Sequence, residues 1–292
     1  MILLTGGTGV VGSALLRRLV VGREPVRCLV RDPRGLGEQR VRVQIALGDL
    51  ADPASFRNAL RGVRTVVHLG ASIRDQPRGS IEELNAVATM RLVRAAERSG
   101  VERFVFFSAL GAALHSRTRF FRAKALARRA VEDASLETTV FSPSIVYTPG
   151  DPWLTLLERL SLLPAVPVSG SGRAQYQPIW AEDVADCVVS ALENGGMGGR
   201  SFELAGPETL SYASIVRTVM RPLGRRRPLL PVPLPVVRLS LEALERVIGP
   251  AVFATWEEAE LMEEPMTSGR GTADAEALGV KPLPMSAVLG TS

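Results

Sequence analysis

Residues 5–12 read TGGTGVVG and place Gly7, Gly9 and Gly12 at the spacing of a dinucleotide-binding loop. The loop follows the apolar run Ile2–Thr5 and opens a helical pattern. Glycines at these positions allow a tight turn, close approach of the backbone to a pyrophosphate, and close packing of the helix on the sheet. An ordinary glycine turn is the alternative for such a triplet. Because the helix start offers free N–H groups to an anion, we expect a pyrophosphate to bind at Gly6, Gly7, Thr8, Gly9, Val10, Val11 and Gly12.

The residue after the second apolar run predicts which dinucleotide is bound. An NAD site usually has an acidic residue about 20 residues beyond the glycines, where it binds the ribose 2′-hydroxyl. Here Val26–Val30 is followed by Arg31, whose guanidinium can pair with the 2′-phosphate of NADP, and Arg34 is a second candidate. In the alternative interpretation Arg31 is a loop residue and Asp32 binds the ribose. We favour NADP(H) over NAD(H).

A short acidic residue follows the third apolar run, in Gly48-Asp49-Leu50. Asp49 could accept a hydrogen bond from the adenine amino group. An aspartate that caps a turn or a helix is an equally good explanation.

The apolar runs recur between helical patterns at the spacing of βαβ units. They are apolar at nearly every position, as in parallel strands covered by helices on both faces. The expected strands are Ile2–Thr5, Val26–Val30, Val43–Leu47, Thr65–Leu69, Phe104–Ser108 and Thr138–Ser142. The expected helices are Val11–Val21, a short one beginning at Asp52-Pro53, Ile81–Ser99 and Arg119–Asp133, with a loop or broken helix between Asp32 and Arg42. The fold class is therefore α/β, a Rossmann-type doubly wound parallel sheet.

The pattern changes after Pro143, where prolines and glycines divide shorter elements. We expect a dinucleotide-binding domain over residues 1–150, with its sheet completed by later segments. Residues 151–292 are then a smaller α+β substrate lobe and a C-terminal helical segment. The expected helices are Glu182–Leu192, one near Val236–Ile248 after a proline-rich connector, and one near Thr255–Met262.

Composition argues against several classes of protein. The net charge of +5 comes from arginines scattered over both halves, and only 5% of residues are aromatic, so a nucleic-acid-binding stripe is not expected. The basic run 225–227 could contact phosphate or acidic lipid, or be a solvated loop. Cys28 and Cys187 lie in apolar stretches, as free thiols do in a reducing cytosol. Neither a signal peptide, nor a membrane span, nor metal-ligand spacing around His68 or His115 is expected.

Together these features resemble the extended and atypical short-chain dehydrogenase/reductase family, which includes NAD(P)-dependent epimerases and dehydratases. The resemblance is carried by TGGTGVVG, LVRDP, GDL, VVHLGA, Asn85, FVFFSA, SPSIVY and QPIWAEDVA, and so extends over most of the chain. The C-terminal segment from Pro231 to Pro284 is similar to a subgroup that includes the nucleotide-binding accessory subunit of respiratory complex I. The resemblance implies that Leu50, Leu69, Gly70, Ala71, Pro143, Ile145 and Lys124 also line the cofactor.

The catalytic motif departs from the family. Its members use a Tyr-x-x-x-Lys pair in which the lysine lowers the pKa of the phenol and binds the nicotinamide ribose. This chain has FFRAK, so Lys124 is retained and Phe120 replaces the tyrosine. Ser108 matches the family's catalytic Ser/Thr, although a serine at a strand end is also a routine cap. Tyr147 is a packing residue in the family and a weak substitute for the missing phenol.

Three functions are compatible with this sequence. The first is an NADP(H)-dependent oxidoreductase or epimerase-like enzyme, in which Lys124 or water passes the proton. The second is a non-catalytic NADPH-binding subunit or assembly factor of a respiratory complex, and the third is an NADPH redox sensor. Lys124 and Ser108 favour the enzyme, whereas Phe120 and the C-terminal segment favour the subunit. We expect a cytoplasmic protein with a small-molecule substrate, or one that is peripheral at the inner face of the membrane.

Overall fold

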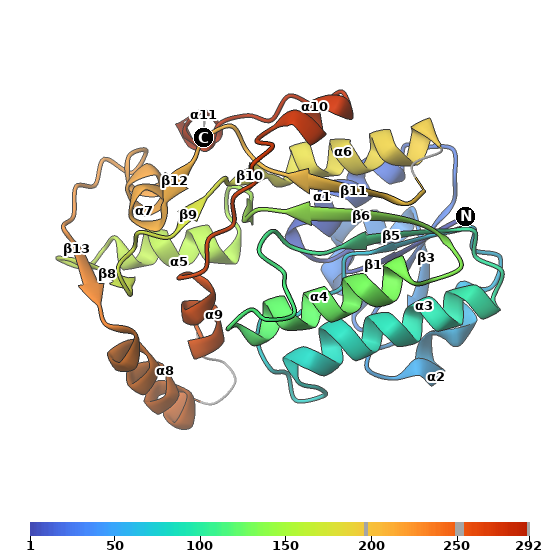
Figure 1. Ribbon diagram of the computed structural model, residues 1–292, viewed down its shortest axis with the longest axis horizontal. Helices are drawn as coiled ribbons and strands as arrows, with labels where there is room; N and C mark the ends of the chain where they lie inside the picture. Colours follow the sequence, from blue (N-terminus) through green and yellow to red (C-terminus); the bar gives the residue numbers. More distant parts are fainter. Residues whose placement is uncertain (196–197, 249–253, 291–292) are drawn as a thin grey trace.

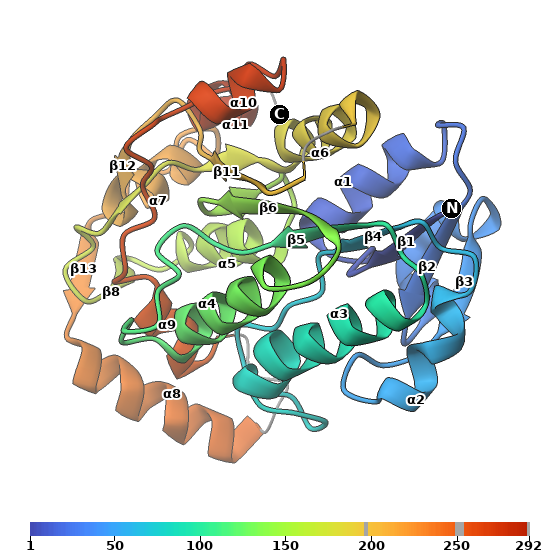
Figure 2. The same ribbon diagram turned by 45° about the vertical axis from the view of Figure 1, so that its right-hand side comes forward.

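A seven-stranded parallel sheet forms the centre of the molecule (Figures 1 and 2). The computed structural model describes residues 1–195, 198–248 and 254–290. The strand order is β11-β6-β5-β4-β1-β2-β3. The strands are β1 (Ile2–Thr5), β2 (Val26–Val30), β3 (Gln44–Leu47), β4 (Thr65–His68), β5 (Arg103–Phe107), β6 (Glu137–Pro143) and β11 (Arg200–Leu204). The α/β fold with a doubly wound parallel sheet is thus confirmed.

The chain begins in the middle of this sheet. Ile2 of β1 pairs with Val26 of β2 on one side and with Thr65 of β4 on the other. From β1 the strand order runs in opposite directions, to β3 and to β11, so β1 and β4 flank the topological switch point. Ligands of open α/β sheets bind in the crevice at the carboxyl ends of such strands.

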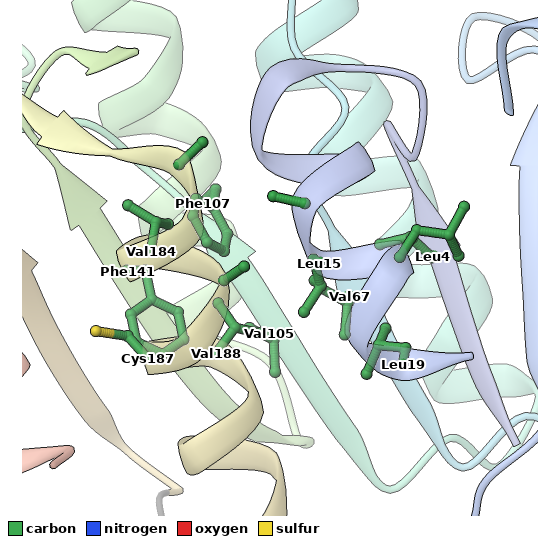
Figure 3. Packing of buried hydrophobic residues seen from close by; sticks show 14 of the residues in the cluster. Leu4, Leu15, Leu19, Val67, Val105, Phe107, Phe141, Val184, Cys187 and Val188 are labelled. Carbon is green, nitrogen blue, oxygen red and sulfur yellow. The ribbon is translucent and has the colours of Figure 1, made fainter. Parts of the chain in front are cut away.

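Helices cover both faces of the sheet (Figure 1). On one face lie α1 (Val10–Leu19) and α6 (Ala181–Asn194), which contact each other. On the other face lie α3 (Ala88–Arg98) and α4 (Arg119–Glu132). Figure 3 shows part of the core of the first face, where Leu15 and Leu19 of α1 and Val184 and Val188 of α6 pack over the strands. Cys187 belongs to this core and Cys28 of β2 is also buried; both are free thiols, as expected.

The sequence predicted that later segments complete the sheet, but it did not locate β11, and it did not predict the π-helical turn before α3. β11 pairs with β6 at the edge of the sheet, and its polar residues alternate with buried ones. Its sequence is therefore not a continuous apolar run, which is why the apolar pattern did not locate it. The helix expected at Ile81–Ser99 begins with a π-helical turn, η3 (Glu83–Val87), before α3.

The connection from β2 to β3 is a broken helix, as predicted. It is a 3-10 segment, η1 (Pro33–Val41), interrupted at Gly37 where φ is +57°. The short helix expected after Asp52 is α2 (Pro53–Phe56), followed by the 3-10 turn η2 (Arg57–Leu60).

The remaining elements lie beside the carboxyl ends of the strands (Figure 1). The strand pairs are β7 (Val146–Tyr147) with β10 (Ile179–Trp180), β9 (Gln175–Tyr176) with β12 (Leu210–Ser211), and β8 (Val166–Ser169) with β13 (Leu229–Val232). The helices are α5 (Pro152–Leu160), α7 (Tyr212–Met220), α8 (Leu234–Ile248), α9 (Trp256–Leu261), α10 (Ala273–Ala277) and α11 (Met285–Gly290). The proline-rich connector thus contains β13, which tolerates Pro231 because it pairs with β8 alone. None of the helices in the described ranges combines the length and apolar composition needed to span a bilayer.

Candidate cofactor and catalytic site

The glycine loop joins β1 to α1 at the carboxyl edge of the sheet. Gly6 has φ of +72°, a left-handed conformation that favours glycine. A Cβ atom on Gly12 would lie 2.0 Å from the carbonyl oxygen of Gly6, so the loop and the helix can pack only if residue 12 is glycine. A Cβ on Gly9 would meet only the Gly6 oxygen, at 3.4 Å, which is an ordinary contact. The protein itself therefore tolerates a side chain at Gly9, and the open space beside it fits a ligand that approaches the backbone.

The first turn of α1 supplies donors for an anion. Thr8 and Gly9 are exposed, and Val10 and Val11 are half-buried behind them. The first amides of a helix have no intrahelical acceptor, and the helix dipole places partial positive charge there. The turn contains no acidic residue and Gly9 provides no side-chain cap. These features fit a bound pyrophosphate.

Three strand ends meet next to this loop. A Cβ on Gly6 would lie 2.7 Å from the amide nitrogen of Gly70, and a Cβ on Gly70 would lie 2.6 Å from Leu50 Cδ1. Leu69 is half-buried and Ala71 is exposed beyond it. The residues expected to line the cofactor after the third and fourth strands are therefore brought together beside the glycine loop.

A hollow of about 560 Å³ opens beyond these strand ends, lined by Arg31, Asp49, Asp52, Ser55 and Arg78 among others. Asp49 Oδ1 accepts a hydrogen bond from the Ala51 amide at 3.0 Å, as expected of a turn-capping aspartate. Its other oxygen, Oδ2, lies 3.2 Å from Arg78 Nη1. Asp49 thus caps the turn and also faces the hollow, so its two interpretations are not exclusive.

Arg34, the second candidate for the 2′-phosphate, and Asp32, the alternative ligand of the ribose, pair with each other. Arg34 and Asp32 form an ion pair of 2.6 Å, and the hydrogen bonds from Arg34 lower the pKa of Asp32. Asp32 also caps the start of η1 through the Arg34 amide. Arg31 is exposed and lines the hollow, and is therefore better placed than Arg34 to meet a 2′-phosphate.

Lys124 lies on α4 with its ammonium group buried against the end of β5. It is only 3% exposed, and Nζ donates a 2.6 Å hydrogen bond to the carbonyl oxygen of Phe107. The ring of Phe106 lies 5.0 Å from Nζ. Burial disfavours the charged form and lowers the pKa of Lys124 to about 7. Lys124 can therefore gain or lose a proton near neutral pH.

Phe120 lies one helical turn before Lys124, on the same face of α4. Its ring centroid is 5.9 Å from Lys124 Nζ, as the i, i+4 spacing predicts. The ring is half-buried and packs on Ile81, Ala86 and Ala123. An aromatic ring thus lies beside the lysine at the position of the family's phenol, but it has no proton to transfer.

Ser108 follows the carbonyl to which Lys124 is bonded. The Ser108 amide donates a 2.7 Å hydrogen bond to the carbonyl oxygen of Phe141, and the residue is 4% exposed. Among the described residues, the Ser108 hydroxyl has no hydrogen-bond partner. A serine that merely capped the strand would use its hydroxyl locally, so the free hydroxyl agrees better with a role toward a ligand.

Pro143 and Ile145 lie at the carboxyl end of β6, next to the segment that carries Ser108. The Leu110 amide donates a 2.9 Å hydrogen bond to the carbonyl oxygen of Pro143. The Ile179 amide donates a 3.0 Å hydrogen bond to the carbonyl oxygen of Ile145. Between them, Ser144 Oγ donates to the carbonyl of Met266 at 2.7 Å. The C-terminal segment is therefore bound directly against this strand end.

The remaining candidate acids are unsuited to catalysis. Tyr147 is fully buried in a hydrophobic cluster that includes Leu154 of α5 and Ile215 of α7, and burial raises the pKa of its phenol. His115 is exposed. His68 is buried, and its pKa falls to about 3 because burial and the charge of Lys124 disfavour protonation. In the described part of the chain, no group of three or more His, Cys, Asp or Glu residues is placed to hold a metal ion.

The structure gives His68 a positioning role that sequence reasoning missed. One ring nitrogen, Nδ1, is 2.6 Å from Thr5 Oγ1 at the start of the glycine loop, and Nε2 is 2.9 Å from Thr89 Oγ1. The Thr89 hydroxyl donates to the Asn85 carbonyl in the π-helical turn. This buried chain of hydrogen bonds connects the glycine loop to the turn that lies against α4.

The comparison with known proteins identifies the family. A family model described as NAD(P)H-binding matches residues 6–195. Subunit 9 of the mitochondrial NADH dehydrogenase (ubiquinone) 1 alpha subcomplex of Arabidopsis thaliana is 30% identical over 219 residues, 70% of this chain and 54% of that protein. The chain thus spans about half of that relative. The NAD(P)H azoreductase of Xenophilus azovorans is 28% identical over 254 residues, 85% of this chain and 80% of that protein.

Solved structures show the same fold at low sequence identity. A nucleoside-diphosphate-sugar epimerase from Staphylococcus aureus superposes with a TM-score of 0.78 at 19% identity, covering 99% of both chains. An NADPH-dependent quinone oxidoreductase from Escherichia coli gives 0.76 at 15% identity, covering 100% of this chain and 99% of the other. The chain therefore belongs to the NAD(P)H-binding family and has the fold of short-chain dehydrogenases and sugar-nucleotide epimerases.

Proposed function

We propose that this protein is an NADP(H)-dependent oxidoreductase in which Lys124 takes over the proton transfer of the missing tyrosine. The observation that carries the proposal is the buried Lys124 ammonium, which lies next to the ring of Phe120. Burial lowers the pKa of this ammonium to about 7. A general acid works best when its pKa is near the operating pH. A lysine with an ordinary pKa of 10.5 would be a much weaker acid at neutral pH.

The preference for NADP(H) is part of the proposal. Arg31 offers a guanidinium where the second strand ends, and Arg34 already neutralises Asp32, the acidic residue that could have bound a free ribose hydroxyl. An arginine can hold a phosphate through two parallel N–H donors. A 2′-phosphate therefore gains contacts here that a 2′-hydroxyl does not.

The nicotinamide ring, when bound, supplies or accepts the hydride. In the reductive direction the substrate oxygen takes a proton from the Lys124 ammonium, which leaves Lys124 as a neutral amine. Solvent then reprotonates this amine. The free hydroxyl of Ser108 can donate a hydrogen bond to the same oxygen. The half-buried ring of Phe120 packs on Ile81 and Ala86 at the position where the family has a phenol.

The test compares two lysine variants. Reductase activity with NADPH is measured on a panel of ketones, sugar nucleotides and azo compounds, the last because a relative is an azoreductase. Lys124→Met should lower kcat by roughly 10²–10⁴-fold, the usual contribution of a positioned acid. Lys281→Met is the matched control because Lys281 is the other lysine and is exposed. Full activity of Lys124→Met would contradict the role of Lys124.

A second function has support from a specific relationship. The complex I subunit of Mus musculus is 25% identical over 96% of this chain, which includes the C-terminal segment. A non-catalytic NADPH-binding subunit would also explain why Phe120 is tolerated. If wild type binds NADPH but reduces no member of the panel, this second function is preferred. A cytoplasmic location belongs to the first proposal, because Cys28 and Cys187 are free thiols suited to a reducing compartment.

A further inference from the structure

The loop after β4 brings a second arginine to the adenosine end of the site. Residues 72–80 leave the sheet next to Gly70 and extend toward the end of β3, where Arg78 meets Asp49 at 3.2 Å. The Arg78 side chain is 71% exposed, whereas that of Asp49 is 14% exposed. Gln76 and Gly79 exchange backbone hydrogen bonds of 3.0 and 3.1 Å, which close the loop into a tight turn. The guanidinium of Arg78 therefore projects from an ordered turn.

Contacts on both sides of the turn fix its position. Asn85 Nδ2 donates to the Ser72 carbonyl at 2.7 Å, and the Ser72 amide donates back to Asn85 Oδ1 at 3.2 Å. The Asp75 carboxylate accepts from the Ile81 amide at 2.7 Å and pairs with Arg119 of α4 at 2.9 Å. Such contacts reduce the conformational freedom that a ligand would otherwise have to remove from the loop.

The neighbouring Arg74 pairs with Glu258 of α9 at 2.7 Å. The Glu258 side chain is 18% exposed and also caps its own helix through the Thr255 amide. The loop is thus held at Ser72 by Asn85 of the turn η3 and at Arg74 by Glu258 of α9.

Arg31 and Arg78 line the same hollow from two different loops, one after β2 and one after β4. From this geometry we propose that Arg78 is a second specificity-determining residue, which binds the adenosine 2′-phosphate together with Arg31. The inference rests on the proposed preference for NADP(H) and adds a residue to it. A phosphate has three peripheral oxygens, so two guanidiniums can share it without competing for one acceptor.

The Asp49–Arg78 pair does not prevent this role. An ion pair with one partner exposed contributes little to stability, so Arg78 can leave Asp49 and pair with a phosphate dianion at little cost. In the absence of phosphate, Asp49 holds the guanidinium at the rim of the hollow. When a 2′-phosphate is present, Arg78 turns toward the greater negative charge, and Asp49 is released to accept from the adenine amino group.

The other possible role of Arg78 is to cover the face of the adenine ring, as a cation over an aromatic system. That role would favour all adenine nucleotides equally. The two roles therefore differ in whether the effect of Arg78 depends on the 2′-phosphate, and the experiment is built on this difference.

The experiment uses adenosine 2′,5′-bisphosphate and adenosine 5′-monophosphate as probes, titrated calorimetrically into the full-length protein. Wild type should bind the bisphosphate more tightly. Arg78→Gln should reduce that discrimination by about tenfold, because one charge-assisted contact at an exposed site is lost. Affinity for the monophosphate should stay within about twofold. Arg57→Gln is the matched control, since Arg57 is exposed on the adjacent turn η2 and does not line the hollow.

Each other outcome overturns the inference in a recognisable way. If Arg78→Gln weakens both probes equally, Arg78 covers the adenine. If it weakens neither, or if Arg57→Gln has the same effect, no local phosphate contact exists. If Arg78→Gln is neutral while Arg31→Ala abolishes the discrimination, the preference for NADP(H) stands and only Arg78 is excluded. If wild type binds neither probe nor NADPH, the proposed function fails as well.

Discussion

The two ends of the candidate site differ in how completely they retain the groups that their roles require. At the dinucleotide end, no side chain covers the backbone of the glycine loop at Gly9, and the exposed Arg31 lines an open hollow. At the reacting end, Lys124 and Ser108 are buried and a phenylalanine replaces the acid. The glycine loop and Arg31 lie apart from Phe120 and Ser108, and Lys124 is the one residue to which both roles are assigned. We therefore expect cofactor binding to persist when Phe120 or Ser108 is altered.

The largest effect should come from the acid itself: Lys124→Met lowers kcat by roughly 10²–10⁴-fold. Phe120→Tyr, which adds a hydroxyl to the ring beside Lys124, should raise kcat by less than about tenfold, because Lys124 is already the proposed acid. The rate constant kcat with NADPH is the measurement. Phe120→Leu, which alters the packing without adding an acid, should not gain activity. A rise of about 10²–10⁴-fold in Phe120→Tyr would show that the wild type lacks an effective acid and would contradict the role of Lys124.

The buried lysine should also make stability depend on pH. Its pKa falls from 10.5 in the unfolded chain to about 7 in the folded protein, so between these values the unfolded state binds more protons. The free energy of unfolding should therefore rise from about pH 7 to pH 9, by roughly 1.4 kcal/mol per pH unit at most. Denaturant titration of wild type and Lys124→Met isolates this contribution, because the buried thiols and phenols are common to both.

Lys281→Met should keep the wild-type slope over the same pH range. If the slope is the same in Lys124→Met, Lys124 does not lose its proton in the folded protein near neutral pH. The acid proposed for the reacting end would then lack its physical basis.

Two glycines of one loop should respond differently to substitution. Gly9→Val should weaken NADPH binding by roughly 10–100-fold or more, since an unrelieved overlap with the ligand costs about 1–3 kcal/mol. Its melting temperature should stay near that of wild type, because a Cβ at Gly9 meets nothing closer than 3.4 Å. Calorimetric titration and thermal unfolding measure the two effects.

Gly12→Ala is the contrasting variant, because its Cβ would lie 2.0 Å from the Gly6 oxygen. It should lower the stability of the protein itself. If Gly9→Val binds NADPH normally, the loop does not contact the pyrophosphate.

Local sequence signals predicted the central parallel sheet and the NAD(P)H-binding family. The glycine spacing, the apolar runs and the i, i+4 relation of Phe120 to Lys124 all depend on neighbours in the chain. β11 was missed because an edge strand is only half-covered and alternates with polar residues. The position of Arg78 was missed because it depends on Asp49, 29 residues away, and on the loop contact between Arg74 and Glu258, 184 residues apart. Such pairings are determined by the tertiary fold.

The most direct test of the account is a calorimetric titration of NADPH and NADH into wild type and Arg31→Ala. Wild type should bind NADPH more tightly, by about 10–100-fold, since a charge-assisted contact to the 2′-phosphate contributes about 1.5–3 kcal/mol. Arg31→Ala should lose most of this preference and keep its affinity for NADH. Equal binding of both cofactors by wild type, or an undiminished preference in Arg31→Ala, would contradict it.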